Sequence, residues 1–373
     1  MQLNSSNNET YHLSLRAKVS IIKTTPIQGP EAWVGDDHAD NQDWIYHLSQ
    51  EDLEDLDKGL QNLRSLGMSF PGFKKQHFPL TGLTTKLDLL TDELENGRGF
   101  FLLRGLPLEN YTEQDINAIY YGIGLYLGTP VGQNPRGDLL GAVENTGDLN
   151  DKHTRVYETN RYLPYHSDPS DVVALLCLRQ AKQGGLSSLV SVAAIYNELL
   201  EKYPQFVGIY YKFFYYTHLC EDLPSLSPLF SFHKGKLSCR YLRQYVELGH
   251  EIMNFPLAKV EIEALNLFDE IMQQEHLRLD MMMQPGDIQF ANNYMVLHSR
   301  SSFEDYEELD QRRKLLRLWL KMPNARELAP EFPGRNGFPL PEWNHCEAPK
   351  ALILLVGQTQ HSDVTISIKQ GIA

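Results

Sequence analysis

The sequence predicts a mainly β fold with flanking helices, in which the strands form a barrel or a jelly roll. The main observation is a change of pattern at about residue 140. Beyond it, short apolar runs are separated by Gly, Pro and Asn, which is typical of strands joined by turns. Before it, apolar residues recur at the three- and four-residue spacing of amphipathic helices. No internal repeat and no obvious linker divides the 373 residues, so we expect one domain with an N-terminal helical elaboration.

The part of the chain before residue 140 alternates between predicted helices and strands. Leucines at 53, 56, 60, 63 and 66 set the pattern of the first helix. We expect ten disordered residues at the start. The elements expected after them are a strand over 11–24 ended by Gly29-Pro30, a helix over Asp52–Leu66, a loop over Ser69–Pro79, a helix over Leu83–Leu94 stopped by Asn96-Gly97, a strand over Gly99–Leu103 and a helix over Thr112–Leu127.

The later part of the chain is predicted to supply most of the strands. One long helix is expected over Leu257–His276. The apolar runs interpreted as strands are 172–178, 189–192, 209–219, 237–242, 277–283, 287–293 and 314–320.

Composition excludes several classes of partner. A net charge of −14 argues against binding to nucleic acid or to an anionic membrane surface, because both would repel the chain on average. The four cysteines show no CxxC spacing, and no run approaches the roughly 18 apolar residues of a membrane span. We therefore expect a cytoplasmic protein that acts on a small molecule. Whether the chain forms a homo-oligomer stays open.

A split cluster of metal-ligating residue types is the main functional signal. His166-Ser167-Asp168 lies in mid-chain and His298 lies far downstream. Two imidazoles and one carboxylate are the ligand set of the facial triad, which leaves positions open on a non-haem Fe(II). Residues two apart in an extended segment point to the same face, so both side chains of the first pair can reach one ion. The third ligand must then come from a strand that the fold brings alongside.

Two other His-x-Asp sequences show that the spacing alone is a weak signal. His38-Ala39-Asp40 lies in a polar loop without a strand to fix the ligands. His361-Ser362-Asp363 lies in the last dozen residues, with no histidine after it. His166 differs because predicted rigid elements flank it on both sides, which a metal site requires.

Arginines follow His298 in a strand pattern. Residues 313, 315 and 317 share one face of an extended strand, so Arg313 and Arg317 would point into an apolar interior beside Leu315. Because a buried unpaired arginine is costly, inward arginines imply an anionic partner. A dicarboxylate such as 2-oxoglutarate supplies one, since its distal carboxylate accepts the bidentate guanidinium fork. The alternative is a solvated edge strand.

Taken together, these sequences resemble the taurine dioxygenase (TauD/TfdA) family of Fe(II)/2-oxoglutarate-dependent oxygenases. The similarity runs from about Leu80 to Met322 and is greatest to the branch near γ-butyrobetaine hydroxylase and clavaminate synthase. The motifs that carry it are Gly99 to Gly105, Leu163 to Asp168, Gly184 to Ser188, Pro285-Gly286-Asp287, Asn292-Asn293, His298-Ser299-Arg300 and Arg313 to Trp319.

The resemblance implies roles for residues at matching positions. His166, Asp168 and His298 would hold the catalytic iron, and Arg313 would bind the distal carboxylate of 2-oxoglutarate. Ser187 matches the position at which many members place a threonine that hydrogen-bonds the same carboxylate.

Further roles stay open at this stage. Ser188 competes with Ser187 for the carboxylate contact. Arg317 matches a second arginine that in relatives reaches either the cosubstrate or an anionic group of the substrate. Asn145 and Tyr162, together with Arg317, are the candidates for substrate contact.

The resemblance also implies a domain layout and a reaction. A double-stranded β-helix (jelly roll) core would occupy 76–345, between an N-terminal extension over 1–75 and a C-terminal tail over 346–373. With Fe(II), 2-oxoglutarate and O₂, it would couple decarboxylation of 2-oxoglutarate to succinate with oxidation of a small polar substrate such as an amino acid, a betaine or an amine. Hydroxylation, desaturation and cyclisation are all open.

Three other classes of protein share some of these features. The isopenicillin-N-synthase-like class needs an Arg-x-Ser at a suitable spacing beyond the distal histidine, and Arg300-x-Ser302 lies too close. A demethylase of the JmjC type usually pairs its oxo acid with Lys rather than with an arginine pair. A non-catalytic jelly-roll protein that binds a small molecule is the alternative of a different kind, and it need not keep all three ligands plus Arg313.

Overall fold

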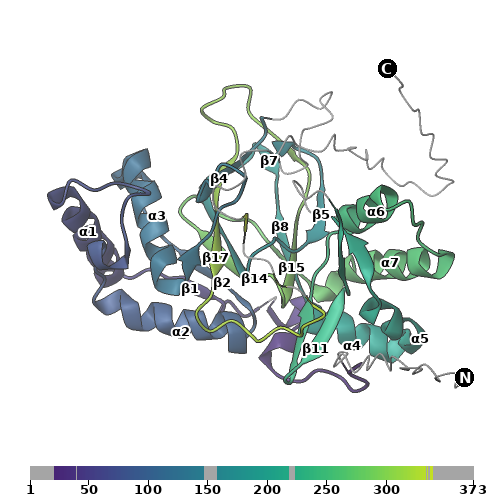
Figure 1. The fold of residues 1–373 in the computed structure, drawn as a ribbon. Coiled ribbons are helices and arrows are strands. Elements are labelled where there is room, and N and C mark those ends of the chain that lie inside the picture. Colours follow the sequence, from purple (N-terminus) through teal and green to yellow (C-terminus); the bar gives the residue numbers. More distant parts are fainter. Residues whose placement is uncertain are drawn as a thin grey trace, which may run out of the picture.

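The structure of the chain is a computed structural model that describes residues 21–38, 40–146, 158–217, 223–332, 334, 337 and 338. Helices and sheets are both abundant, and two sheets lie in the middle with helices on either side (Figure 1). The prediction of sheets with flanking helices is therefore confirmed, but the described residues form a mixed helix and sheet fold and not a mainly β one.

The larger sheet is antiparallel except at one edge, where β1 runs parallel to β2. Its longest strands, β6 and β17, pair along most of their length, and β4 and β3 also pair with β17. In spatial order the strands are β1 (Ile45–His47), β2 (Phe100–Arg104), β14 (Ile288–Asn292), β6 (Val172–Arg179), β17 (Lys314–Lys321) and β3 (Thr129–Pro130), with β4 (Leu140–Glu144) beside β17.

The smaller sheet is antiparallel throughout. Its strands in order are β13 (Arg278–Met281), β8 (Ser187–Ser191), β15 (Val296–Arg300) and β5 (Leu163–His166). Short two-stranded ribbons join β7 (Gln183–Gly184) to β16 (Phe303–Glu304), β9 (Phe214–Tyr216) to β10 (Ser225–Ser227) and β11 (Phe230–His233) to β12 (Lys236–Cys239).

Each outer sheet face is covered by its own group of helices (Figure 1). The larger sheet carries α1 (Gln50–Ser65), α2 (Gly82–Asn96) and α3 (Glu113–Leu127). The smaller sheet carries α4 (Val192–Lys202), α5 (Pro204–Val207), α6 (Arg243–Ile252) and α7 (Lys259–Met272). Ser49 and Thr112 begin α1 and α3 with capping boxes, in which each side chain accepts from the backbone three residues on. None of the helices in the described residues combines the length and the apolar character needed to cross a bilayer.

Alternation along the strands divides the core into layers. On β6, Ala174 and Leu176 pack outward against α1 to α3, whereas Val173 and Cys177 face inward. The inner cluster also contains residues of the smaller sheet, such as Leu189. The two sheets therefore face each other across a shared apolar layer, and the candidate site lies in that layer.

Most predicted elements are present, and three differ. Residues 21–24 form no strand, and the rest of the strand expected over 11–24 lies outside the described residues. The run 209–219 is divided between a 3₁₀ turn over Gly208–Tyr211 and the strand β9, and residues 218 and 219 are not described. The helix expected over Leu257–His276 is shorter: α7 ends at Met272, and a 3₁₀ turn then buries Leu277 in the core before β13 begins.

The predicted division into 1–75, 76–345 and 346–373 stays a prediction. Residues from 339 onward are not described, and neither are residues 1–20.

Candidate active site

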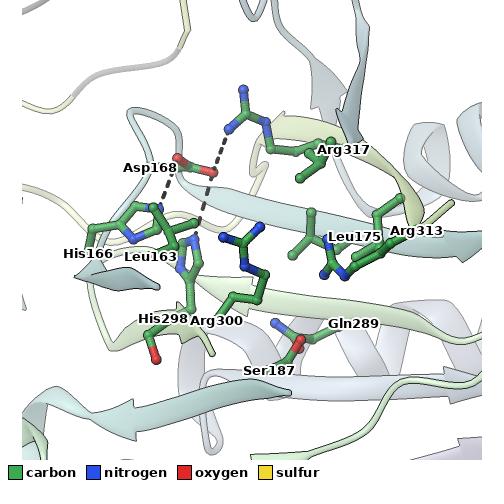
Figure 2. A pocket seen from close by; sticks show the side chains of 13 residues that line it. Leu163, His166, Asp168, Leu175, Ser187, Gln289, His298, Arg300, Arg313 and Arg317 are labelled. Carbon is green, nitrogen blue, oxygen red and sulfur yellow. Dashed lines mark ion pairs between the residues drawn. The ribbon is translucent and has the colours of Figure 1, made fainter. Parts of the chain in front are cut away.

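The two histidines of the predicted cluster lie opposite each other on neighbouring strands. β15 pairs with β5 so that His298 is the direct partner of His166. Their ring centroids are 4.2 Å apart, and both rings face the inner side of the smaller sheet (Figure 2). Strand pairing therefore brings together two residues that are far apart in the sequence.

Asp168 joins them from a loop and not from the strand itself. β5 ends at His166, so strand pairing does not hold Ser167 and Asp168. Instead, the backbone N–H of Asp168 donates to Asn293 Oδ1 at 2.9 Å, and the N–H of Ser167 donates to the carbonyl of Tyr241 at 2.9 Å. These bonds hold the loop so that the carboxylate turns back toward the imidazoles.

The three side chains have the geometry of a metal site. Their ligand atoms all lie within 4.8 Å of one another. His166 Nε2 lies 3.9 Å from Asp168 Oδ1, and His298 Nε2 lies 3.9 Å from Oδ2, as the dashed lines of Figure 2 show. Two imidazoles and a carboxylate at this spacing could hold a divalent iron on one side and leave other positions open.

The protonation states also suit a metal. His166 Nδ1 donates to the carbonyl of Pro164 at 2.8 Å, so the neutral ring presents an unprotonated Nε2. Burial lowers the pKa of His166, and burial together with the charge of His166 lowers the pKa of His298 to about 3. Both rings are therefore neutral near pH 7, which is the form that binds a metal.

Asp168 is kept ionised by its neighbours. Burial raises the pKa of this carboxyl, but the charge of Arg317 and the two imidazoles outweigh it, so the net pKa is lowered. Trp319 Nε1 donates to Asp168 Oδ2 at 2.9 Å, and Arg317 Nη1 lies 3.6 Å from the same oxygen.

A cavity opens beside the triad. Its lining comes from both sheets: Val143, Leu163, His166, Asp168, Leu175, Ser187, Gln289, His298, Ser299, Arg300, Arg313, Leu315 and Arg317. Residues 313, 315 and 317 all line it, as their alternation along the strand predicts, so this is no solvated edge.

Arg313 is buried in this wall without an ion pair among the described residues. Its Nη1 has no hydrogen-bond partner, and its guanidinium lies 5.2 Å from the ring of Phe303. Burial lowers the pKa of Arg313 to about 10, which leaves it charged at pH 7. Gly185, at φ 76°, passes so close that a Cβ there would lie 3.2 Å from Arg313 Nε. The Gly184-Gly185 turn thus makes room for this side chain.

Arg317 is held differently. Its Nε donates to Gln133 Oε1 at 2.8 Å, and its guanidinium stacks 4.5 Å from the ring of Trp319. It contacts the carboxylate of Asp168, so it lies at the metal end of the cavity (Figure 2).

The two candidate serines point in opposite directions. Ser187 lines the cavity. Ser188 turns to the other face of β8, where its hydroxyl lies 2.5 Å from the Tyr165 hydroxyl and donates to Asp280. Only Ser187 is therefore placed to contact a ligand in the cavity.

Asn145 and Tyr162 do not line the cavity. Tyr162 is 39% exposed, and its hydroxyl accepts from Gln273 Nε2 at 2.6 Å. Of the two other His-x-Asp sequences, the first contains His38. The His38 ring packs against Trp33 and Phe100, and it belongs to no candidate metal-ligand group in the described residues. His361 lies outside them.

Sequence reasoning did not select three polar residues of the lining, Gln289, Ser299 and Arg300. Arg300 lies two residues beyond His298 on the same face of β15 and donates to the carbonyls of Thr159 and Arg161. Alternation from His298 could have identified it. Gln289 is a polar residue between the apolar Ile288 and Phe290 of β14, which was the available signal.

Comparison with known proteins places this geometry among oxygenases. The model of the family described as "Taurine catabolism dioxygenase TauD, TfdA family" matches residues 56–319. FR-33289 synthase of Streptomyces rubellomurinus (strain ATCC 31215) is 34% identical over 319 residues, which cover 83% of this chain and 94% of that protein. Taurine hydroxylase-like protein SAT17 of Stachybotrys chartarum (strain CBS 109288 / IBT 7711) is 33% identical over 301 residues, 77% of each chain.

Solved structures share the fold. Asparagine oxygenase in complex with Fe(II), 2S,3S-3-hydroxyasparagine and succinate aligns with a TM-score of 0.59 at 17% identity, over 74% of this chain and 93% of that one. The non-heme iron oxygenase OrfP in complex with Fe and alpha-ketoglutaric acid aligns with a TM-score of 0.55 at 14% identity, over 74% and 94%.

We expect His298→Ala to weaken Mn(II) binding by at least about 100-fold, because it removes one of three ligands and even residues that only support metal ligands contribute 10- to 100-fold. Equilibrium dialysis with metal quantification measures this. His361→Ala, which alters another His-x-Asp sequence, is the matched control and should bind as the wild type does. Wild-type affinity in His298→Ala would remove His298 from the ligand set.

The lowered pKa of His298 predicts a pH dependence of stability in the metal-free protein. The unfolded chain, with a histidine pKa near 6.5, binds more protons than the folded chain, so the free energy of unfolding falls as pH drops below 6.5. For His298 alone the loss between pH 8 and pH 5 is about 2 kcal/mol. Urea denaturation at both pH values should show a smaller loss in His298→Gln, and equal losses would contradict the assignment.

Proposed function

We propose that this chain, which belongs to the taurine catabolism dioxygenase (TauD, TfdA) family, hydroxylates a small polar substrate such as an amino acid, a betaine or an amine. It is an Fe(II)- and 2-oxoglutarate-dependent oxygenase that uses O₂. The observation that carries the proposal is the His-Asp-His cluster beside a cavity lined by the buried Arg313. Among the described residues, Arg313 Nη1 has no hydrogen-bond partner.

His166, Asp168 and His298 are the proposed iron ligands. Each offers a lone pair at neutral pH, because both histidine pKa values and the Asp168 pKa are lowered. Trp319 and Arg317 hold the Asp168 carboxylate in place. When bound, Fe(II) supplies the O₂ chemistry that couples decarboxylation of 2-oxoglutarate to succinate and CO₂ with oxidation of the substrate.

Arg313 and Ser187 are the proposed partners of the distal carboxylate of 2-oxoglutarate. A buried guanidinium without an anionic partner is destabilising, and a carboxylate that accepts its fork offsets that cost. The Ser187 hydroxyl lines the same cavity and can donate to the anion.

The charge of the cavity bears on the substrate. Arg300, Arg313 and Arg317 line it together with a single carboxylate, Asp168. A bound divalent ion adds further positive charge, and 2-oxoglutarate offsets two charges. The remaining positive potential favours a substrate with a carboxylate, such as an amino acid or a betaine, over a simple amine. Arg317 is the proposed substrate contact, since it lies near the metal ligands.

The fold supports the proposal of a jelly-roll oxygenase. Two facing sheets enclose the cavity, and we propose that they are the two halves of a double-stranded β-helix. The similar structures are iron oxygenases of the same fold.

Anaerobic spectroscopy separates this function from that of a non-catalytic binding protein. Addition of 2-oxoglutarate to the Fe(II) protein should produce a weak visible charge-transfer band, and its absence in a metal-loaded sample would favour the binding protein. A screen of amino acids, betaines and amines for stimulated succinate release in air then identifies the substrate class.

We expect Arg313→Ala to raise the KM for 2-oxoglutarate about 100-fold, because a charged hydrogen-bonded fork is lost and each factor of ten equals about 1.4 kcal/mol. Arg312→Ala is the matched control: Arg312 donates to the carbonyls of Tyr306 and Glu307 and does not line the cavity. Succinate formation at varied 2-oxoglutarate measures both variants. An unchanged KM in Arg313→Ala would move the role to Arg317, which also lines the cavity.

A further inference from the structure

We propose that Gln289 is a further cosubstrate-binding residue, whose side-chain amide donates a hydrogen bond to the distal carboxylate of 2-oxoglutarate. The inference rests on the proposed function and adds to it a residue that helps to select a dicarboxylate over other oxo acids.

Gln289 is a polar residue in an apolar layer. It lies on the inner face of β14, where its partners across the sheet are Leu102 on β2 and Leu175 on β6. The side chain of Ala291, next on the same face, belongs to the apolar cluster between the sheets. Gln289 is only 2% exposed, yet it lines the cavity. The packing of this layer alone gives no reason for an amide at this position.

The amide also lacks the bonds that buried amides normally make. Its Oε1 has no hydrogen-bond partner among the described residues. By contrast, Asn292 on the same strand donates to the carbonyl of Leu94 at 2.9 Å, and Asn293 donates to the carbonyl of Ser170 at 3.0 Å. An unpaired buried amide is destabilising, and most buried polar groups find partners. A carboxylate cannot donate to Oε1, so it would partner this amide only through the NH₂, with the oxygen and nitrogen of the amide exchanged.

Its position matches the end of the cavity away from the metal. Gln289, Leu175 and Arg317 form one row across β14, β6 and β17. Neighbouring strands lie about 4.8 Å apart, so the backbones of Gln289 and Arg317 are roughly 10 Å apart. Arg317 contacts the metal-binding carboxylate. Figure 2 shows Gln289 and Ser187 together, on the side of the cavity opposite His166 and Asp168.

The hydrogen-bond donors at this end of the cavity favour binding of an anion. Arg313 Nη1 has no hydrogen-bond partner in the ranges that the structure describes, and Ser187 contributes a hydroxyl to the same wall. A carboxylate has about four lone-pair sites, so it can accept from a guanidinium, a hydroxyl and an amide at once. Rotation of the Gln289 amide by half a turn exchanges its oxygen and nitrogen, so the NH₂ can face the anion.

Binding of oxo acids without turnover tests the proposal. Calorimetric titrations use the Mn(II)-loaded protein with 2-oxoglutarate and with 2-oxopentanoate, which has the same five-carbon chain but a methyl group in place of the distal carboxylate. Gln289→Leu keeps a similar volume and removes the amide. We expect it to weaken 2-oxoglutarate about tenfold and to change 2-oxopentanoate by less than about twofold, because only the first ligand loses a charged hydrogen bond.

Two comparisons separate a ligand contact from a structural role. Gln180→Leu removes a partly buried amide that donates to the carbonyl of Met283 outside the cavity lining, and its affinity for 2-oxoglutarate should match that of the wild type. The melting temperature of unliganded Gln289→Leu should equal or exceed that of the wild type, because an unpaired polar group is removed.

The outcomes are distinct. Unchanged affinity of Gln289→Leu for 2-oxoglutarate, or an equal loss for both oxo acids, overturns the assignment of Gln289 while the proposed function stands. A wild-type protein that binds neither oxo acid would instead overturn the proposed function itself.

Discussion

The pairing of β15 with β5 is the interaction on which the rest of the site depends. It sets His298 directly opposite His166, and a shift of one residue would turn one imidazole to the outer face of the sheet. The other elements maintain this register. β8 pairs with the opposite edge of β15, and the aliphatic side chains on the outer face of this sheet pack against α4 and α7. The loop after β5 then needs only a few backbone bonds to bring Asp168 to the same point.

In the proposed function, the cavity has a metal end and an anion end. At the first lie two neutral imidazoles and an ionised carboxylate, which can bind a cation. At the second, Arg313 and Gln289 are buried, and within the part of the chain that the structure describes Arg313 Nη1 and Gln289 Oε1 have no hydrogen-bond partner. Leu175 and Leu315 are apolar residues of the same cavity lining. Preorganised groups of this kind bind without large rearrangement.

Sequence patterns predicted some parts of this site better than others. The period-two alternation correctly placed Arg313 and Arg317 on one face, although Arg313 lies just before β17 and the register shifts between Lys314 and Leu315. The closeness of His166 and His298 was predicted from their ligand chemistry and the family resemblance, since strand pairing between distant segments leaves no local signal. The choice between Ser187 and Ser188 needed the structure, because alternation gives two faces but does not say which one is inner. The sequence pattern did not predict that α7 ends at Met272, because Leu277 continues the apolar pattern but is buried from the 3₁₀ turn that follows the helix.

The most direct test of the account is the anomalous-scattering map of a crystal grown with Mn(II). The account predicts one peak per chain, about 2.2 Å from Nε2 of His166, Nε2 of His298 and a carboxylate oxygen of Asp168. A metal bound elsewhere, or held by only one of the two imidazoles, would contradict it.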